Sequence, residues 1–468
     1  MNSTSSNVDA NAWVAAGERL RAGSHALVSL WGEPGLAHMA LSDAAGNLEV
    51  LHLRCGDHRF PSIGRLHPPA IRLERTMRDL AGLDAEGAPD ARPWLRHSAP
   101  YPFLTAEGEG LHQIPVGPVH AGIIEPGHFR FTVNGEAVVR LEERLGYVHK
   151  GIDALMAGAA LERAARLAGR VSGDSTVAYA LAFSQAVEAA LGAQVPPRAA
   201  WLRALMAELE RLANHFGDIG AVCNDASFTI MHASFGVLRE QVLRAAGACF
   251  GHRLMMDCVL PGGVRGELSA ECAERLATLL ALVKKQWPHL VHLYDNTASL
   301  KDRTVSTGIL SEALARQYAA GGYVGRASGR AFDARRSPGY APYDRLYFQV
   351  PVVHAGDVNA RVWIRIQEVE QSLALVEQIL QQLPAGAIST PVSSAAGVRE
   401  GMALVEGFRG DIFAWVRIGA DGRIERCHLR DPSWFQWPLL EAAIEGNIVA
   451  DFPLCNKSFN CSYSGHDL

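Results

Sequence analysis

Short apolar runs and one helical repeat define the elements expected in the first part of the chain. Residues 26–30 and 48–53 are apolar runs of strand length, and residues 71–82 repeat with helical spacing and end at Gly82. The following stretch, 98–117, holds Pro100, Pro102, Pro115 and several glycines without any period. We therefore expect a small unit over residues 1–97, a linker over 98–114 and a separate unit over 115–468.

Two hairpins are predicted in the second unit. Phe129, Phe131 and Val133 alternate with polar residues, and Asn134-Gly135 follows, which is the dipeptide that a type I′ turn favours. A second hairpin is expected at Asp421-Gly422, between the apolar segments 413–418 and 424–428. Between these hairpins, helical periodicity dominates from about 141 to 307, and a glycine-rich stretch, 321–343, precedes a long helix at about 359–383.

Two of the predicted helices carry a polar stripe beside an apolar one. Residues 202, 205, 209, 212 and 216 form an apolar stripe, and Glu208, Arg211 and His215 stand one residue ahead of its last three members. The second helix repeats this offset, with the polar positions Arg361, Arg365, Glu368 and Ser372 ahead of Val362, Ile366, Val369 and Leu373. Either both polar stripes are solvated faces with local ion pairs, or they face each other and form a buried polar network.

Composition and charge narrow the class of protein. The chain has 468 residues, 48% of them hydrophobic and 20% charged, which favours a large folded core in two to four domains. A net charge of −5 argues against a nucleic-acid partner. Long apolar runs and the pattern of a signal peptide are missing, so a cytoplasmic location is expected.

Common catalytic and metal-binding motifs are absent from the sequence. The eight cysteines form no CxxC pair, which excludes the usual zinc-ribbon, ferredoxin and thioredoxin spacings. Glycine-rich nucleotide loops and nucleophilic serine motifs are absent as well. His289 and His292 could face one way on a helix, but no further ligand follows, so we interpret them as surface residues.

A series of motifs over residues 114–468 resembles the large subunit of nickel–iron hydrogenases and its relative, the D-type subunit of respiratory complex I (NADH–quinone oxidoreductase). The resemblance begins with Gly117-Pro-Val-His-Ala-Gly122 and ends with Asp431-Pro-Ser433 and Ala450-Asp451. Between them, in the family order, stand Glu125–Arg130, Gly146–Gly151, Glu208–Arg211, Asn214-His215, Pro261–Val264, Asp302–Thr304, Arg326–Gly329, Gly356-Asp357, Glu406-Gly407 and Arg409-Gly410. The resemblance implies an α+β, mostly helical fold, in which a long-helix bundle carries peripheral β elements.

The leader over residues 1–97 has a resemblance of its own. Glu74–Gly82 and Gly87–Asp90 are similar to the end of the C-type subunit of complex I. A C-type leader fused to a D-type body is the arrangement of the large subunits of formate hydrogenlyase and hydrogenase-4. The leader is therefore expected to be a small α/β domain, shortened relative to the C-type subunit.

The sequence departs from the hydrogenase pattern at the metal ligands. Hydrogenases of this family hold nickel and iron with four thiolates, and the matching positions here are Ser172, Ser175, Ser462 and Gly465, with Cys461 one residue away from a ligand position. Serine hydroxyls do not replace soft thiolates. The resemblance thus implies no nickel and no metal site in this chain. The C-terminus of the chain also lies close to the position where mature hydrogenase large subunits end. This agrees with a chain that takes up no metal, and the alternative is a natural difference in length.

The D-type subunit uses the same cavity for a quinone headgroup, and two of its residues have counterparts here. His120 matches the histidine of its GPxH loop, and Asp225 matches the aspartate that partners it. Such a pair could relay protons beside a possible quinone. The alternative is that both residues only cap or pack their local segments. The quinone-contacting tyrosine of the D-type subunit falls at Gly173.

These resemblances lead to one functional hypothesis and one alternative. The chain is expected to be the large subunit of a peripheral, membrane-associated complex I-like oxidoreductase on the cytoplasmic side of the cell membrane. It would bind no cofactor firmly itself. Its partners would be a small subunit similar to the B-type subunit of complex I, which carries a 4Fe-4S cluster, and ion-pumping, antiporter-like membrane subunits. The alternative is a non-catalytic scaffold or coupling subunit of such a complex.

Overall fold

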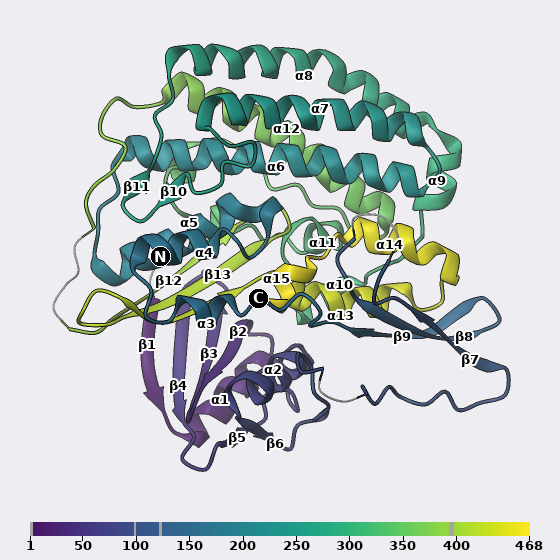
Figure 1. The fold of residues 1–468 in the computed structure, drawn as a ribbon. Helices are drawn as coiled ribbons and strands as arrows, with labels where there is room; N and C mark the ends of the chain where they lie inside the picture. Colours follow the sequence, from purple (N-terminus) through teal and green to yellow (C-terminus); the bar gives the residue numbers. More distant parts are fainter. Residues whose placement is uncertain (1–2, 98–99, 121–123, 393–396) are drawn as a thin grey trace.

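The computed structural model describes residues 3–97, 100–120, 124–392 and 397–468, and its N-terminal part is a small α/β unit (Figure 1). A sheet of order β1-β4-β3-β2 is made by Ser3–Val8, Leu48–Arg54, Leu36–Asp43 and His25–Glu33, with β1 parallel to β4. Helices α1 (Ala10–Arg21) and α2 (Ile71–Ala81) accompany it, as do the short strands β5 (Arg59–Pro61) and β6 (Asp84–Glu86). The predicted helix end at Gly82 is confirmed, because Gly82 has a left-handed φ of 67°.

A second sheet follows the leader and contains the first predicted hairpin. It has the order β7-β8-β9, with β7 at Leu111–Val116, β8 at His128–Asn134 and β9 at Ala137–Arg144. Strand β7 thus begins inside the segment expected to be a linker. Asn134 pairs with Ala137, so Gly135 and Glu136 form the turn, and only Gly135 of the two has a positive φ. The hairpin is confirmed, but its turn lies one residue later than predicted and is not of type I′, which needs two positive φ values.

The long helices of the body lie side by side. In Figure 1, α6 (Pro197–Asp225), α7 (Thr229–Phe250), α8 (Ala270–Asn296) and α12 (Val358–Gln382) run across the top of the molecule. Shorter helices are α3 (Ile152–Met156), α4 (Leu161–Ala168), α5 (Thr176–Leu191), α9 (Ala298–Thr304), α10 (Glu312–Gln317) and α11 (Gly322–Ala327). The small strands β10 (Val259–Leu260) and β11 (Gly263–Val264) pair between α7 and α8. The predicted α+β, mostly helical architecture is confirmed.

A third sheet and three helices complete the body. Strands β12 (Arg399–Glu406), β13 (Asp411–Ile418) and β14 (Ile424–Arg430) are antiparallel, which confirms the hairpin predicted around Asp421-Gly422. Helices α13 (Ser433–Ile444), α14 (Phe452–Phe459) and α15 (Tyr463–Asp467) follow them. In the described part of the chain, no helix combines the length and the hydropathy of a membrane span.

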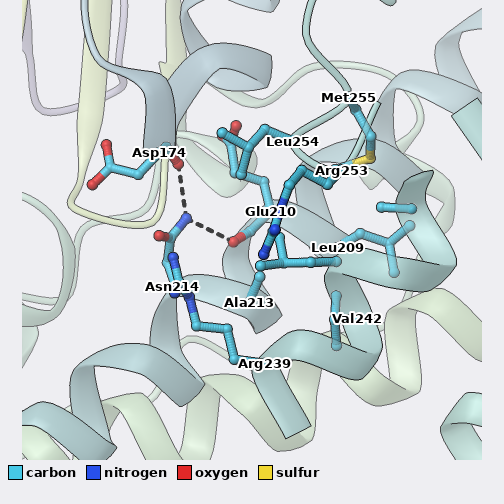
Figure 2. A pocket seen from close by; sticks show the side chains of 12 residues that line it. Asp174, Leu209, Glu210, Ala213, Asn214, Arg239, Val242, Arg253, Leu254 and Met255 are labelled. Carbon is cyan, nitrogen blue, oxygen red and sulfur yellow. Dashed lines mark hydrogen bonds between the residues drawn. The ribbon is translucent and has the colours of Figure 1, made fainter. Parts of the chain in front are cut away.

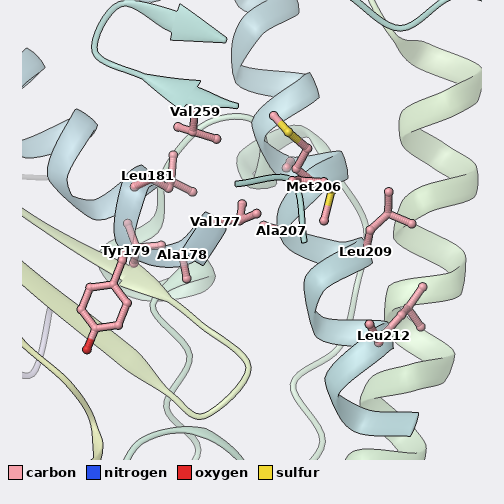
Figure 3. Packing of buried hydrophobic residues seen from close by; sticks show 14 of the residues in the cluster. Val177, Ala178, Tyr179, Leu181, Met206, Ala207, Leu209, Leu212 and Val259 are labelled. Carbon is pink, nitrogen blue, oxygen red and sulfur yellow. The ribbon is translucent and has the colours of Figure 1, made fainter. Parts of the chain in front are cut away.

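Apolar packing joins these parts into one body. Figure 3 shows Val177 and Leu181 of α5 on the side of α6 that carries Met206 and Ala207, all of them buried. A separate apolar cluster joins the leader sheet to the body sheet and contains Val28, Trp31, Met402, Phe413 and Trp415. The leader therefore packs directly on the body of its own chain.

Candidate functional site

The two polar stripes predicted on the long helices face each other and are buried. Their members are at most 1% exposed. His215 Nε2 on α6 lies 2.7 Å from Glu368 Oε2 on α12, and the Ser372 hydroxyl donates a 2.6 Å hydrogen bond to Glu208 Oε2. Arg361 and Arg365 extend the network toward α14, where each hydrogen-bonds to Ser458. The interpretation of these stripes as solvated faces is therefore wrong.

Residues outside both helices complete this network, and the periodicity did not reveal them. Arg326 of α11 lies 2.6 Å from Glu368 and 2.9 Å from Glu406 at the end of β12. Arg335 lies 2.6 Å from Asp333 and 2.9 Å from Glu208. Arg326 and Glu406 stand in family motifs, which could have indicated them. Asp333 and Arg335 stand in no such motif, and a loop or a short helix has no apolar repeat that could reveal them.

Opposite charges decide the ionisation of the central acid. Burial raises the pKa of Glu368, but the charge of Arg326 and the hydrogen bond to His215 outweigh burial and hold the pKa below its ordinary value of 4.5. Burial lowers the pKa of His215 in spite of Glu368. Burial, together with the charge of Asp333, raises the pKa of Glu406 to about 7. The network thus holds an ionised carboxylate at its centre and a proton-binding carboxyl at its edge.

The positions that match the lost thiolate ligands gather beside a cavity of about 560 Å³. The Ser172 and Ser462 hydroxyl oxygens lie 3.2 Å apart although 290 positions separate them in the sequence. Ser172 donates to Asp174 Oδ1 at 2.6 Å, so the Ser462 hydroxyl donates to Ser172. The Ser175 hydroxyl donates to Asp174 Oδ1 at 3.5 Å. The structure therefore brings together one position from the first ligand motif of the family and one from the last.

A carboxylate occupies the space next to Gly465, the fourth ligand position. A Cβ atom on Gly465 would lie 2.4 Å from Asp431 Oδ2. Asp431 is held in place by the Tyr179 hydroxyl at 2.6 Å and by the Ser433 backbone N–H at 2.8 Å. Hydroxyls and a carboxylate are hard oxygen donors, so the side chains here do not fit the nickel–iron group, which requires thiolates.

We expect Gly465→Ala to lower the free energy of unfolding by about 1–3 kcal/mol, because its methyl group would overlap the fixed Asp431 carboxylate. Gly173→Ala is the matched control: it lies on the same cavity wall, and nothing lies within 4 Å of its Cβ position. Denaturant unfolding of both variants measures the difference. An equal loss of stability in both would contradict the close contact at Gly465.

An ion pair forms the deep wall of the cavity. Arg409 donates two hydrogen bonds to the Asp174 carboxylate, at 2.9 and 2.7 Å, and a third to the Asn460 carbonyl at 2.5 Å. Burial raises the pKa of Asp174, but the charge and hydrogen bonds of Arg409, together with Ser172, outweigh it and lower the pKa. No periodicity or spacing indicated this pair, although Asp174 stands between two lost ligand positions.

Behind Asp174 lies a narrow pocket that contains a second buried acid (Figure 2). Asn214 Nδ2 donates to the backbone carbonyls of Asp174 and Glu210, both at 2.8 Å. The Glu210 carboxylate accepts from the Val177 and Ala178 backbone N–H groups at the start of α5, at 2.7 and 3.1 Å. Burial raises the pKa of Glu210 to about 8. Glu210 can therefore take up or release a proton near neutral pH, one element away from the cavity.

Asp225 and His120 do not form the expected direct pair. Asp225 lines the cavity, and burial raises its pKa. His120 Nε2 instead donates a 2.7 Å hydrogen bond to the Gly127 carbonyl, which closes the loop that carries the histidine. Among the described residues, no hydrogen bond joins His120 to Asp225, and positions 121–123 of this loop lie outside them. A shared role for the two residues in proton transfer stays a prediction.

Comparison with known proteins gives a consistent picture. Residues 225–400 match the family described as respiratory-chain NADH dehydrogenase, 49 Kd subunit. The chain is 30% identical to formate hydrogenlyase subunit 5 of Escherichia coli over 87% of its own length and 77% of that protein. It is also 30% identical to a D-type subunit of the NADH-quinone oxidoreductase of Roseiflexus, over 72% of this chain and 94% of that one.

A solved structure supports the same fold. A chain of the membrane-bound sulfane sulfur reductase, an archaeal respiratory membrane complex, superposes with a TM-score of 0.72 at 24% identity and covers 78% of this chain. The combination of a long-helix bundle, paired family motifs at one cavity and these relatives leads to one conclusion. The chain belongs to the family of the 49-kDa, D-type subunit of complex I and the large subunits of membrane-bound hydrogenases, whose members are subunits of oxidoreductase complexes.

Proposed function

We propose that the chain is the large subunit of a complex I-like, membrane-associated oxidoreductase that works without a nickel–iron site. The observation that carries the proposal is the meeting of Ser172 with Ser462 and the filling of the space beside Gly465 by Asp431. The ancestral ligand positions still converge on one cavity, but their side chains are a hydrogen-bonded set of oxygens. The chain thus has a cavity at the position of the hydrogenase metal site, but oxygen atoms line it where hydrogenases have thiolates.

The residues around this cavity suit proton chemistry. Its walls hold the acids Glu125, Asp174 and Asp225 and the cations Arg409 and Lys457. These groups can bind an oxidised acceptor, such as a quinone, and deliver protons as that acceptor is reduced. Burial raises the pKa of four cysteines, Cys223, Cys427, Cys455 and Cys461, which disfavours the thiolate that a metal ligand needs.

Electrons would then come from a partner. In this proposal they arrive from a 4Fe-4S cluster on a small subunit similar to the B-type subunit of complex I. Antiporter-like membrane subunits would use the energy of the reaction to move ions, with this chain on the cytoplasmic side of the membrane. Measuring nickel and iron in the native complex, together with its rate of electron transfer to a soluble quinone, tests the proposal. Stoichiometric nickel would refute it, and the absence of any electron transfer would favour a scaffold role.

Asp225→Asn and His120→Ala should each abolish electron transfer through the assembled complex and leave assembly intact. Asp225 lines the cavity, and burial raises the pKa of its carboxyl, so it binds a proton more readily than an exposed aspartate does. Asp295→Asn is the control, because Asp295 is about half exposed and pairs with Lys301 at 2.8 Å, and it does not line the cavity. Turnover and ion pumping at the wild-type rate in the Asp225 and His120 variants would show that both residues are structural.

A further inference from the structure

A second cavity, of about 650 Å³, lies where the leader meets the body. It shares no lining residue with the cavity at Ser172. The leader contributes the end of α1, the turn into β2, the end of β3 and His67, while the body contributes α10 and the segment 330–337. Its volume falls in the range of about 300–1,000 Å³ that is usual for sites that bind small molecules.

Arg330, on the body side of this cavity, is a cation without a carboxylate partner in the described part of the chain. Its Nη1 donates to the Ala320 carbonyl at 2.9 Å, and its guanidinium carbon lies 4.4 Å from the centre of the Phe332 ring. The acids whose charge reaches it are bound elsewhere: Asp411 pairs with Arg430, and Glu406 pairs with Arg326. Burial lowers the pKa of Arg330 to about 10, so it stays charged at neutral pH.

A largely buried charge without a counter-charge is costly, which raises the question of what neutralises Arg330. The rest of the cavity wall holds two further cations, Arg21 and Arg316, each paired with a nearby glutamate. Burial lowers the pKa of His67 to about 4, so its ring is neutral at neutral pH. Asp43 is the one acidic residue among the described lining residues. The Asp43 carboxylate is already occupied, because it accepts hydrogen bonds from the Ala45 and Asn47 backbones and from the Asn47 side chain.

His67 adds an independent observation. It is only 4% exposed, and its Nε2 atom is buried without a hydrogen-bond partner among the described residues, although the residue lines the cavity. A buried ring nitrogen of this kind normally has a partner in the protein or in a ligand. Arg316 reaches the same cavity and is paired with Glu312 by hydrogen bonds of 2.8 and 2.6 Å. Arg330 therefore lacks a carboxylate partner, and His67 Nε2 lacks a hydrogen-bond partner, among the described residues.

We propose that this cavity binds a small phosphorylated ligand, whose phosphate pairs with Arg330 and accepts a hydrogen bond from His67. The planar guanidinium fork matches two phosphate oxygens. The hydroxyl of Ser42 is a further donor on the wall, and Leu20 and Leu66 offer an apolar surface for the organic part of the ligand. This site is separate from the proposed electron-transfer cavity and does not depend on its chemistry.

Calorimetric titration of the full chain with inorganic phosphate and with ADP tests the proposal. ADP should bind to the wild type, and Arg330→Gln should weaken binding by about tenfold to a hundredfold through the loss of a charge-assisted pair. Arg244→Gln is the control, since Arg244 is highly exposed and pairs with Glu240 on α7. Tighter binding of ADP than of phosphate indicates a nucleotide-like ligand, and the reverse indicates free phosphate. If neither probe binds, or if Arg330→Gln binds as the wild type does, the proposal is wrong.

Thermal unfolding supplies a second readout, in which each variant without phosphate is its own reference. Phosphate should raise the Tm of the wild type and of Arg244→Gln, because a ligand that binds only the native state stabilises it. Arg330→Gln should lose this increase, while its Tm without phosphate stays equal or rises, because the unpaired charge is gone. Arg316→Gln, at an exposed side chain, should reduce the increase in part. An equal phosphate-dependent increase in all variants would indicate a general salt effect and would refute the site.

Discussion

Replacing Glu368 with glutamine is expected to lower the free energy of unfolding by about 3–5 kcal/mol. Glu368 accepts from Arg326 Nε at 2.8 Å and from His215 at 2.7 Å, and it is 1% exposed. Removing its charge takes away the carboxylate that lies nearest to the Arg326 guanidinium, and leaves Glu406 at 2.9 Å and Asp333 at 3.7 Å in a region that water does not reach. In the wild type, the attraction of Glu368 offsets the free energy that burial of the Arg326 cation costs. In the variant this attraction is missing, so the folded state is less stable.

Glu377→Gln is the matched control for this experiment. Glu377 lies on the same helix, α12, and pairs with Lys284 at 2.6 Å, but both side chains are about half exposed. Exposed pairs contribute only about 0–1 kcal/mol, so this variant should remain near the wild type. Denaturant unfolding at neutral pH compares the two, and a similar loss in both would show that burial of the network adds no energy.

The stability of the wild type should depend more strongly on pH in the acidic range than the stability of Glu368→Gln. The pKa of Glu368 is held below its ordinary value of 4.5, so the stability that it contributes is complete above that value and is lost as pH falls through the folded pKa. Glutamine does not titrate. The stability gap between the wild type and Glu368→Gln should therefore narrow on acidification below about pH 4.5.

Arg409→Gln is expected to reduce electron transfer through the native complex by about a hundredfold. Arg409 holds Asp174 with two hydrogen bonds and keeps the pKa of that carboxyl low. Without Arg409, burial should raise the pKa of Asp174, and the cavity wall should become protonated at a higher pH. The pH profile of the remaining activity should then shift upward, which a purely structural defect would not produce.

Arg198→Gln provides the comparison for Arg409→Gln. Arg198 also pairs with a carboxylate through several hydrogen bonds, to Glu267 at 2.5 to 3.0 Å, but Glu267 is largely exposed and neither residue lines the cavity. The same chemical change should therefore leave the rate and its pH profile unaltered. A wild-type pH profile in Arg409→Gln would contradict the proposed influence on Asp174.

Periodicity predicted the parts of the structure that a repeat encodes. The offset polar stripes of α6 and α12 marked the residues of the network, because side chains one residue apart turn about 100° around a helix, but left open whether these residues face solvent or each other. Asp333 and Arg335, which complete it, stand in an irregular segment where no period applies. Their contacts depend on the fold of the whole chain, which local sequence does not encode.

The missed strands have equally specific reasons. Strand β1 consists almost entirely of exposed polar residues, so it has no apolar face, and its position comes from parallel pairing with β4. Strand β7 contains Pro115, which usually argues against a strand, and it pairs on one side only, with β8. His120 lies on a loop, as its glycine and proline neighbours predict, but the acceptor of its hydrogen bond, the Gly127 carbonyl, carries no side-chain signal.

The contact between Ser172 and Ser462 also affects when the cavity can form during synthesis of the chain. A ribosome completes residue 172 long before residue 462, and 290 positions separate the two. The helix bundle can form from contacts that are nearer in sequence, whereas the cavity needs its last wall, α14 and the residues after it. Closing so long a loop is slow compared with local packing. During synthesis, the cavity therefore cannot close before residues 452–464 have left the ribosome, however much of the helix bundle has formed by then.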